Sequence, residues 1–212
     1  MLTKFLFRNV AKLSARKKLL TLIDDQIQHD FSAYKYDKKV SLFLQMSGFE
    51  LEDEENSKFV FLRKKIGKID LEINFEAQYQ MNLSNIEGLK IETTQEKVKS
   101  YADFNLFITN TENNSGIFAD CSTCNSNLVY HHIVHSENMS IFKDPIASSK
   151  QFLGRDLEKV KRPYVEHLIL YLNEFGVDPD VLNFIEIYSA DKEFRLYMAW
   201  LVKIKDFLKK KL

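Results

Sequence analysis

The sequence is poor in the residues that usually build turn-rich, cross-linked or membrane-spanning proteins. Its 212 residues include only 6 Gly and 3 Pro, which argues against a turn-dense β-sandwich and against a disordered linker protein. Two cysteines are too few to cross-link a chain of this size, so disulfides are not the expected source of stability. No run of 18 apolar residues occurs, so no membrane span is expected.

The motifs that would indicate an enzyme are also missing. Glycine loops of the GxxxxGK[ST] and GxGxxG types, the GxSxG elbow and the HExxH helix are all absent from the sequence. Glu72 and Glu76 could be imagined as an acid–base pair, but on a strand they lie roughly 13 Å apart. The sequence therefore predicts a non-enzymatic protein that needs no cofactor.

One cluster contains residue types that bind metals: Cys121, Cys124, His131, His132 and His135. Only six residues separate Cys124 from His131, whereas a zinc finger needs about 12 to 15. Cys121 is also in phase with the apolar face of an expected strand, where small free cysteines are usually core residues. We predict no metal site here, and a metalloenzyme remains the least favoured of three hypotheses.

The charges are unevenly distributed although the formal net charge is zero. Residues 1–23 contain six bases and no acid, so residues 24–212 hold 24 bases against 30 acids, a net charge of −6. A basic, apolar and acid-free start is typical of a mitochondrial transit peptide. We predict a transit segment at 1–18 and a single domain at 19–212. The alternative is that residues 4–23 form an ordinary basic first helix.

Hydrophobic periodicity predicts a helix, then a series of strands, then helices. This order lacks the strand–helix alternation of a βαβ protein, so it indicates an α+β fold in which an antiparallel meander carries terminal helices on one face. The strand at 69–80 has the clearest alternation, with one apolar face and one acidic face. A helix is expected at 17–31, strands at 41–51, 58–64, 69–80, 101–109, 117–122 and 128–135, and three helical segments within 164–211.

The expected last helix is apolar on two sides, so it needs two covers, and another subunit could supply one of them. One stripe contains Phe194, Tyr197, Met198 and Leu201, whereas the other contains Leu196, Trp200 and Phe207.

Two acidic stretches form the candidate surface for basic partners, such as ribosomal or RNA-binding proteins. Basic runs at 63–65, 159–162 and 209–211 could instead form a patch for RNA, but each is more often a solvated edge or helix end. The candidate acids are Glu50, Glu52, Asp53, Glu54, Glu55, Asp70, Glu72 and Glu76.

Two blocks of the sequence resemble the mitochondrial acidic matrix protein family, also called the mitochondrial glycoprotein family. The first block is residues 48–78, GFELEDEENSKFVFLRKKIGKIDLEINFEAQ, in which an apolar strand ending in basic residues precedes a long alternating strand. The second block, within residues 164–211, is similar to the C-terminal signature of the family. The best matches are Leu172, Gly176, Lys192, Glu193, Tyr197, Trp200, Leu201 and Phe207.

The resemblance implies a twisted antiparallel sheet of about seven strands, flanked by an N-terminal helix and C-terminal helices, in a ring-shaped homotrimer. It also implies a location in the mitochondrial matrix and a scaffold or chaperone-like role in mitochondrial translation, ribosome assembly or RNA metabolism. A direct RNA-binding or RNA-processing (editing) cofactor is the alternative. On this basis the Phe194 stripe should cover the sheet, and the expected trimer interface contains Leu20, Ile23, Ile27, Leu196, Trp200 and Phe207.

Overall fold

The computed structural model describes residues 2–78 and 100–210 of the chain. The chain forms two compact units, one made of residues 1–36 together with 194–212 and the other of residues 37–193. The larger unit contains the sheet, and the smaller one consists of helices.

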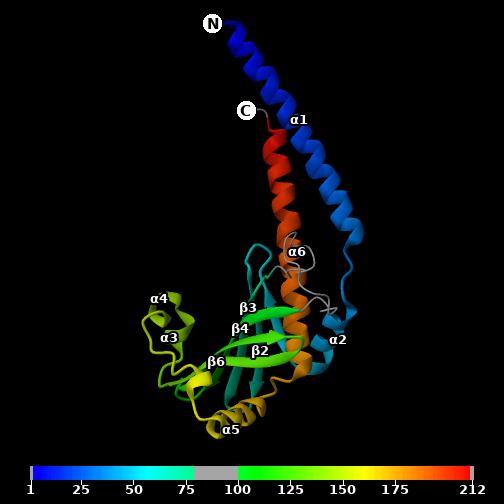
Figure 1. Ribbon diagram of the computed structural model, residues 1–212. Coiled ribbons are helices and arrows are strands. Elements are labelled where there is room, and N and C mark those ends of the chain that lie inside the picture. Colours follow the sequence, from blue (N-terminus) through cyan, green and yellow to red (C-terminus); the bar gives the residue numbers. More distant parts are fainter. Residues whose placement is uncertain (1, 79–99, 211–212) are drawn as a thin grey trace, which may run out of the picture. The chain divides into compact units, whose positions relative to one another are not determined.

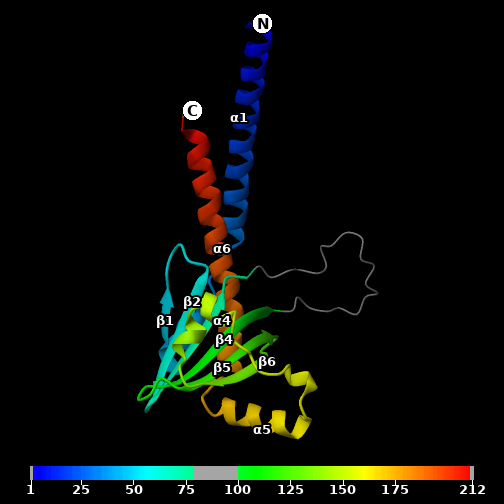
Figure 2. The ribbon, with the colours of Figure 1, turned by 90° about the vertical axis from the view of Figure 1, so that its left-hand side faces the viewer.

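The larger unit is built on an antiparallel meander of six strands in the order β1-β2-β3-β4-β5-β6 (Figures 1 and 2). The predicted α+β class is confirmed, whereas the expected number of about seven strands is not matched by the six that the described residues form. The strands are β1 Glu50–Asp53, β2 Phe59–Ile66, β3 Ile69–Glu76, β4 Tyr101–Asn110, β5 Gly116–Cys124 and β6 Asn127–Ser136.

Alternation along β3 gives the sheet its inner face. Leu71, Ile73 and Phe75 are buried, and Ile73 pairs with Leu62 of β2 and Leu106 of β4. Each fully buried aliphatic or aromatic side chain contributes about 1.5–3 kcal/mol relative to exposure. The inner face is therefore the main source of the stability of this unit.

Three helices cover the inner face: α2 Lys38–Ser47, α5 Arg162–Asn173 and the first half of α6 Pro179–Lys209. The prediction of a strand at 41–51 is wrong, because residues 38–47 are helical and the strand β1 starts only at Glu50. Asp37 caps α2 by accepting a hydrogen bond from Lys39 N, and Gly48 ends it with a left-handed backbone, φ 72°.

The outer face of the sheet is partly covered as well. Phe107 of β4 and Phe118 of β5 pack with Met139 and Phe142 in a second, smaller apolar cluster. Phe142 belongs to the short helix α3 Ser140–Lys143, which α4 Pro145–Ser148 and a 3-10 turn at Leu157–Lys159 follow. The acidic face predicted for β3 is therefore only partly open to solvent.

The region 164–211 forms two helices rather than the three predicted segments, because α6 is continuous over 31 residues. Clear end and start signals separate the two helices. Gly176 adopts φ 88° shortly after α5, and Asp178 Oδ1 accepts hydrogen bonds from Asp180 N and Val181 N, both at 3.0 Å. Pro179 then occupies the first helical position of α6, where its missing N–H costs nothing.

In the smaller unit α1 Leu2–Ala33 runs antiparallel to the C-terminal part of α6 (Figures 1 and 2). Arg16 donates to the carbonyls of Leu208 and Lys210, and Lys205 forms an ion pair with Asp24. The ring of Phe194 stacks on Tyr34 at 4.6 Å, so the prediction that the Phe194 stripe covers the sheet is wrong for this residue. The sheet is covered by residues earlier in α6, from Val181 to Tyr188.

Candidate partner-binding surface

The acids predicted to bind partners lie on β1, on β3 and in the turn after β1. Since β2 lies between β1 and β3, its Arg63 directly faces Glu50 on one neighbour and Glu72 on the other. The two acidic stretches of the sequence are therefore brought together across one strand. Their spacing along the chain could not show this, because it depends on the register of the sheet.

Arg63 bridges the two acidic strands. Its guanidinium donates to the carboxylates of Glu52 on β1 and Glu72 on β3, the latter at 2.8 Å. Lys143 of α3 also donates to Glu72, at 3.1 Å. The hydrogen bond to Glu72 raises the pKa of Arg63 above its usual value. This bridge neutralises part of the predicted acidic surface.

Glu72 is almost completely buried, with 8% of its surface exposed. Burial alone would raise its pKa, but the hydrogen bonds and charges of Arg63 and Lys143 outweigh this and lower the pKa below the usual value. The carboxylate is thus held in its charged form inside an ion-pair cluster, where a partner cannot easily reach it.

Asp53 is engaged by the helix α6. The ammonium group of Lys192, which is completely buried, donates to the Asp53 carboxylate and to the carbonyl of Glu54, the latter at 2.6 Å. The hydroxyl of Tyr188 donates to Asp53 as well, at 2.6 Å. These contacts fix the end of β1 and the start of the acidic turn to α6. They are structural, and neither Tyr188 nor Lys192 was among the predicted site residues.

Four of the predicted acids remain open. Glu50, Glu54, Glu55 and Asp70 are exposed, and within the described residues none has a cationic partner. Glu76, in contrast, forms an ion pair with Lys58. The surface available to a basic partner is therefore smaller than the sequence suggests: Glu50 and Asp70 lie beside the paired cluster of Arg63, Glu72 and Lys143, and Glu54 and Glu55 follow β1. We call Glu50, Glu54, Glu55 and Asp70 the open acids.

The residues predicted at a trimer interface lie on the two helices of the smaller unit. Ile23 is buried within the chain itself, whereas Trp200 and Phe207 are exposed. Leu20, Ile27 and Leu196 are half-buried. Further exposed apolar side chains of this unit, which the prediction did not include, are Leu19, Leu22, Phe31 and Val202.

The cysteines and histidines occupy the strands β5 and β6. Cys121 is buried, and burial together with the charge of Asp120 raises the pKa of its thiol well above the usual value. His131 Nε2 lies 2.9 Å from Ser122 Oγ, and His132 Nδ1 lies 3.4 Å from Asp120. Across residues 2–78 and 100–210, no group of three or more His, Cys, Asp or Glu side chains is arranged to hold a metal ion.

No described helix combines the length and the apolar content that crossing a bilayer requires.

The sequence profile of the mitochondrial glycoprotein family (MAM33) matches residues 23–208. A comparison with curated protein sequences found no match.

Among solved structures, the chain is similar to a Leishmania major protein described as a sequence homologue of human p32. The TM-score is 0.72 at 17% identity, and the match covers 92% of this chain and 99% of that one. It is also similar to the Trypanosoma brucei p22 protein, with a TM-score of 0.68 at 15% identity and coverage of 92% and 100%. At such low identity these likenesses show the fold.

Proposed function

Because the chain belongs to the mitochondrial glycoprotein family, we propose that it is a mitochondrial scaffold that binds basic proteins through the open acids and catalyses no reaction. The observation that carries the proposal is that Glu50, Glu54, Glu55 and Asp70 are exposed without a described ion pair, whereas Glu52 and Glu72 are already paired with Arg63 and Lys143. A partner that brings cations to these four carboxylates does not have to break an existing ion pair.

We also propose an oligomeric state, a cellular location and a biological process for this protein. The exposed rings of Trp200 and Phe207, together with exposed Leu19, Leu22 and Val202 of the same unit, support a homotrimer, because a large exposed apolar surface often marks a protein–protein interface. The acid-free start of the sequence supports import into the mitochondrial matrix. Basic partners in that compartment include ribosomal and RNA-binding proteins, so we propose a role in translation, ribosome assembly or RNA metabolism.

A direct RNA-binding role has less support. Several bases of the runs that could contact phosphates are already engaged by acids of the same chain. Arg63 is bound by Glu52 and Glu72, and Arg162 by Glu166 at 2.8 Å. We therefore expect RNA to be reached through a bound protein rather than through these side chains.

The first test measures binding of a fluorescein-labelled oligolysine peptide by anisotropy, at several salt concentrations. Exposed ion pairs contribute about 0.5 kcal/mol each, so removal of four should cost about 2 kcal/mol, or roughly 30-fold in Kd. The affinity of the wild-type protein should also fall as salt is added, because exposed charges are screened. The variant carries Glu50→Gln, Glu54→Gln, Glu55→Gln and Asp70→Asn.

A matched control distinguishes the effect of losing the open acids from the effect of changing the net charge. It neutralises four exposed acids elsewhere, which leaves the same net charge as the first variant. We expect this control to bind the peptide within about threefold of the wild type, since distant exposed charges are screened. Equal losses in both variants would contradict the proposed surface. The control carries Asp25→Asn, Glu137→Gln, Glu174→Gln and Asp206→Asn.

The second test identifies the partners. Wild-type protein and both variants are used as baits in mitochondrial extract, and bound proteins are quantified by mass spectrometry. Basic proteins should be retained by the wild type and the control and lost from the open-acid variant. RNase treatment tests the alternative hypothesis of direct RNA binding. If RNase releases every partner and a 20-nucleotide RNA binds the bait alone, the direct RNA-binding hypothesis is the correct one.

A further inference from the structure

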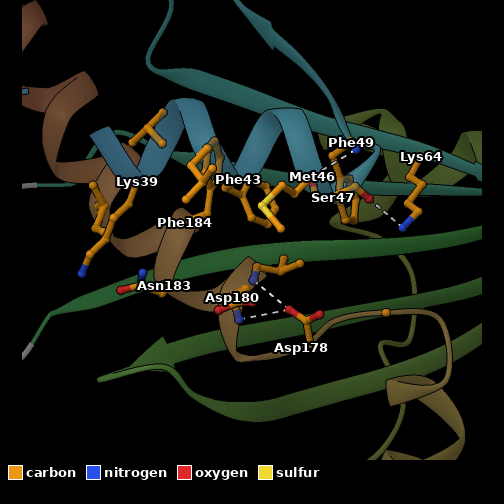
Figure 3. Close-up of a pocket in the computed structure, with 15 residues that line it drawn as sticks. Lys39, Phe43, Met46, Ser47, Phe49, Lys64, Asp178, Asp180, Asn183 and Phe184 are labelled. Atoms are coloured by element: carbon orange, nitrogen blue, oxygen red, sulfur yellow. Dashed lines mark hydrogen bonds between the residues drawn. The ribbon is translucent and has the colours of Figure 1, made fainter. Parts of the chain in front are cut away.

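A groove runs along α2 in the larger unit, between this helix and the first turns of α6 (Figure 3). Its volume is about 410 Å³, within the range of sites that hold ligands or peptide segments. The lining is mainly apolar and comes from both helices and from the residue that leads into β1. The apolar lining residues are Val40, Leu42, Phe43, Met46, Phe49, Val181, Phe184 and Ile187.

The floor of the groove is well packed. The ring of Phe43 lies 4.5 Å from that of Phe184 and 6.0 Å from that of Phe49, both in stacked arrangements. Val40 and Val181 are buried beside them. Because packed aromatic rings hold their positions, the groove is a preformed feature and does not have to open before something binds.

The rim is apolar and open to solvent. Leu42 is 56% exposed and Met46 is 78% exposed. They lie four residues apart on α2, so they are neighbours on one side of the helix. A flexible methionine at the edge of an apolar groove is a feature of surfaces that accept several related partners. These two side chains are in position to be covered when the groove is filled.

The two walls carry opposite charges. Lys39 and Lys64 lie at the two ends of α2, and Asp178 and Asp180 lie on the α6 side (Figure 3). Lys64 donates to the carbonyl of Ser47 at 2.8 Å, which holds its ammonium group at one end of the groove. A single-headed lipid would match only one wall. A helix with charged flanks can match both.

We propose that the groove binds an amphipathic helix of a partner protein. The helix presents an apolar stripe to the floor, acids to the lysine side and bases to the aspartate side. The ten residues of α2 span about 15 Å, so the occupant contacts the groove over about ten residues or three turns. This site is distinct from the open acids, because it recognises an apolar stripe and not only positive charge.

The test uses three fluorescein-labelled 14-residue peptides and the full-length protein. All three have leucines at positions i, i+3, i+4 and i+7. One has glutamates along one flank and lysines along the other, one has glutamates on both flanks, and one has lysines on both. Anisotropy should show that the mixed peptide binds at least tenfold more tightly than either single-sign peptide. Equal affinity for all three would overturn the assignment of the walls.

Variants locate the binding site on the protein. Leu42→Glu with Met46→Glu should weaken binding of the mixed peptide at least tenfold, while circular dichroism stays unchanged, because both side chains are on the exposed rim. Leu170→Glu with Ile146→Glu is the matched control, since these side chains are 63% and 71% exposed and do not line the groove. Unchanged binding by the rim variant, or an equal loss in the control, would overturn the proposal.

A charge exchange gives an independent check. Asp180→Lys makes the α6 wall more positive while the lysines of the other wall stay in place, so this variant should change its preference to the peptide with glutamates on both flanks. Other occupants give different results. If the rim variant has a lower mass by light scattering, a second copy of this chain covers the groove and the proposal fails. If palmitate displaces the mixed peptide from the wild type, and the rim variant no longer binds palmitate, the occupant is a lipid and the proposal also fails.

Discussion

Replacement of Lys192 by methionine removes a buried cation while keeping a side chain of similar length. In the wild type the Lys192 ammonium is completely buried and donates to the Asp53 carboxylate and to the Glu54 carbonyl. Methionine has no donor for either acceptor. Asp53 would keep its hydrogen bond from Tyr188, but its negative charge would have lost the cation that the buried ammonium provides.

The expected cost follows from this geometry. Removal of one member of a buried ion pair usually costs about 3–5 kcal/mol, because the other charge stays buried without compensation. The Asp53 side chain is only 12% exposed, so water can replace little of the lost interaction. We therefore expect the free energy of unfolding to fall by about 3–5 kcal/mol. This is a large fraction of the ~5–15 kcal/mol that stabilises an ordinary domain.

Urea unfolding followed by circular dichroism measures this cost. Protein concentration must be fixed, because association shifts the midpoint. Lys209→Met, at an exposed position near the end of the same helix, is the control and should stay within about 0.5 kcal/mol of wild type. Lys192→Met combined with Asp53→Leu removes both charges and should cost less than Lys192→Met alone. A loss below about 1 kcal/mol for Lys192→Met, or no relief in the double variant, would refute the reasoning.

Two further predictions concern the ion-pair cluster and the helices. Arg63 and Lys143 lower the pKa of Glu72 below its usual 4.5, so its ionised form stabilises the protein above that pH, and this contribution disappears as pH falls through the lowered value. Wild type should therefore lose more stability in urea titrations on acidification from about pH 6 to about pH 3 than Glu72→Gln, and an equal loss would contradict this. Trp200→Glu with Phe207→Glu should reduce the mass measured by light scattering from that of the proposed trimer to that of a monomer, with little loss of helix. An unchanged mass would exclude these rings from the interface.

The strands β2 to β6 could be predicted because one face of the sheet is buried, which imposes alternation on the sequence. The helix α2 could not be predicted from periodicity alone. Val40, Leu42, Leu44 and Met46 alternate as in a strand, whereas the helix packs Val40, Phe43 and Leu44 inward. The end signals were present, since Asp37 is a favoured N-cap and Gly48 a favoured C-terminal residue. These signals, given more weight than the alternation, would have located the helix.

The sequence shows which acids could form the candidate surface, but not which of them are neutralised by cations of the same chain. Acids that are neighbours in the sequence were recognised, but the cations that neutralise some of them come from distant elements. Lys192 is 139 residues from Asp53, and Lys143 is 71 residues from Glu72. Such pairs depend on packing between elements, which local pattern does not encode. The groove along α2 was missed for the related reason that its main helix was predicted as a strand.

If the chain is cleaved as a precursor, as its basic start suggests, the contacts of Arg16 would connect that cleavage to the stability of the other end of the chain. Arg16 donates to the carbonyls of Leu208 and Lys210, where the last turn of α6 has backbone acceptors without helical partners and the negative end of its dipole. The transit segment predicted at 1–18 contains this arginine. A protease that cuts at residue 18 would therefore remove the cap of a helix almost two hundred residues away. A cut before Arg16 would leave the mature protein with both ends of the chain fastened together.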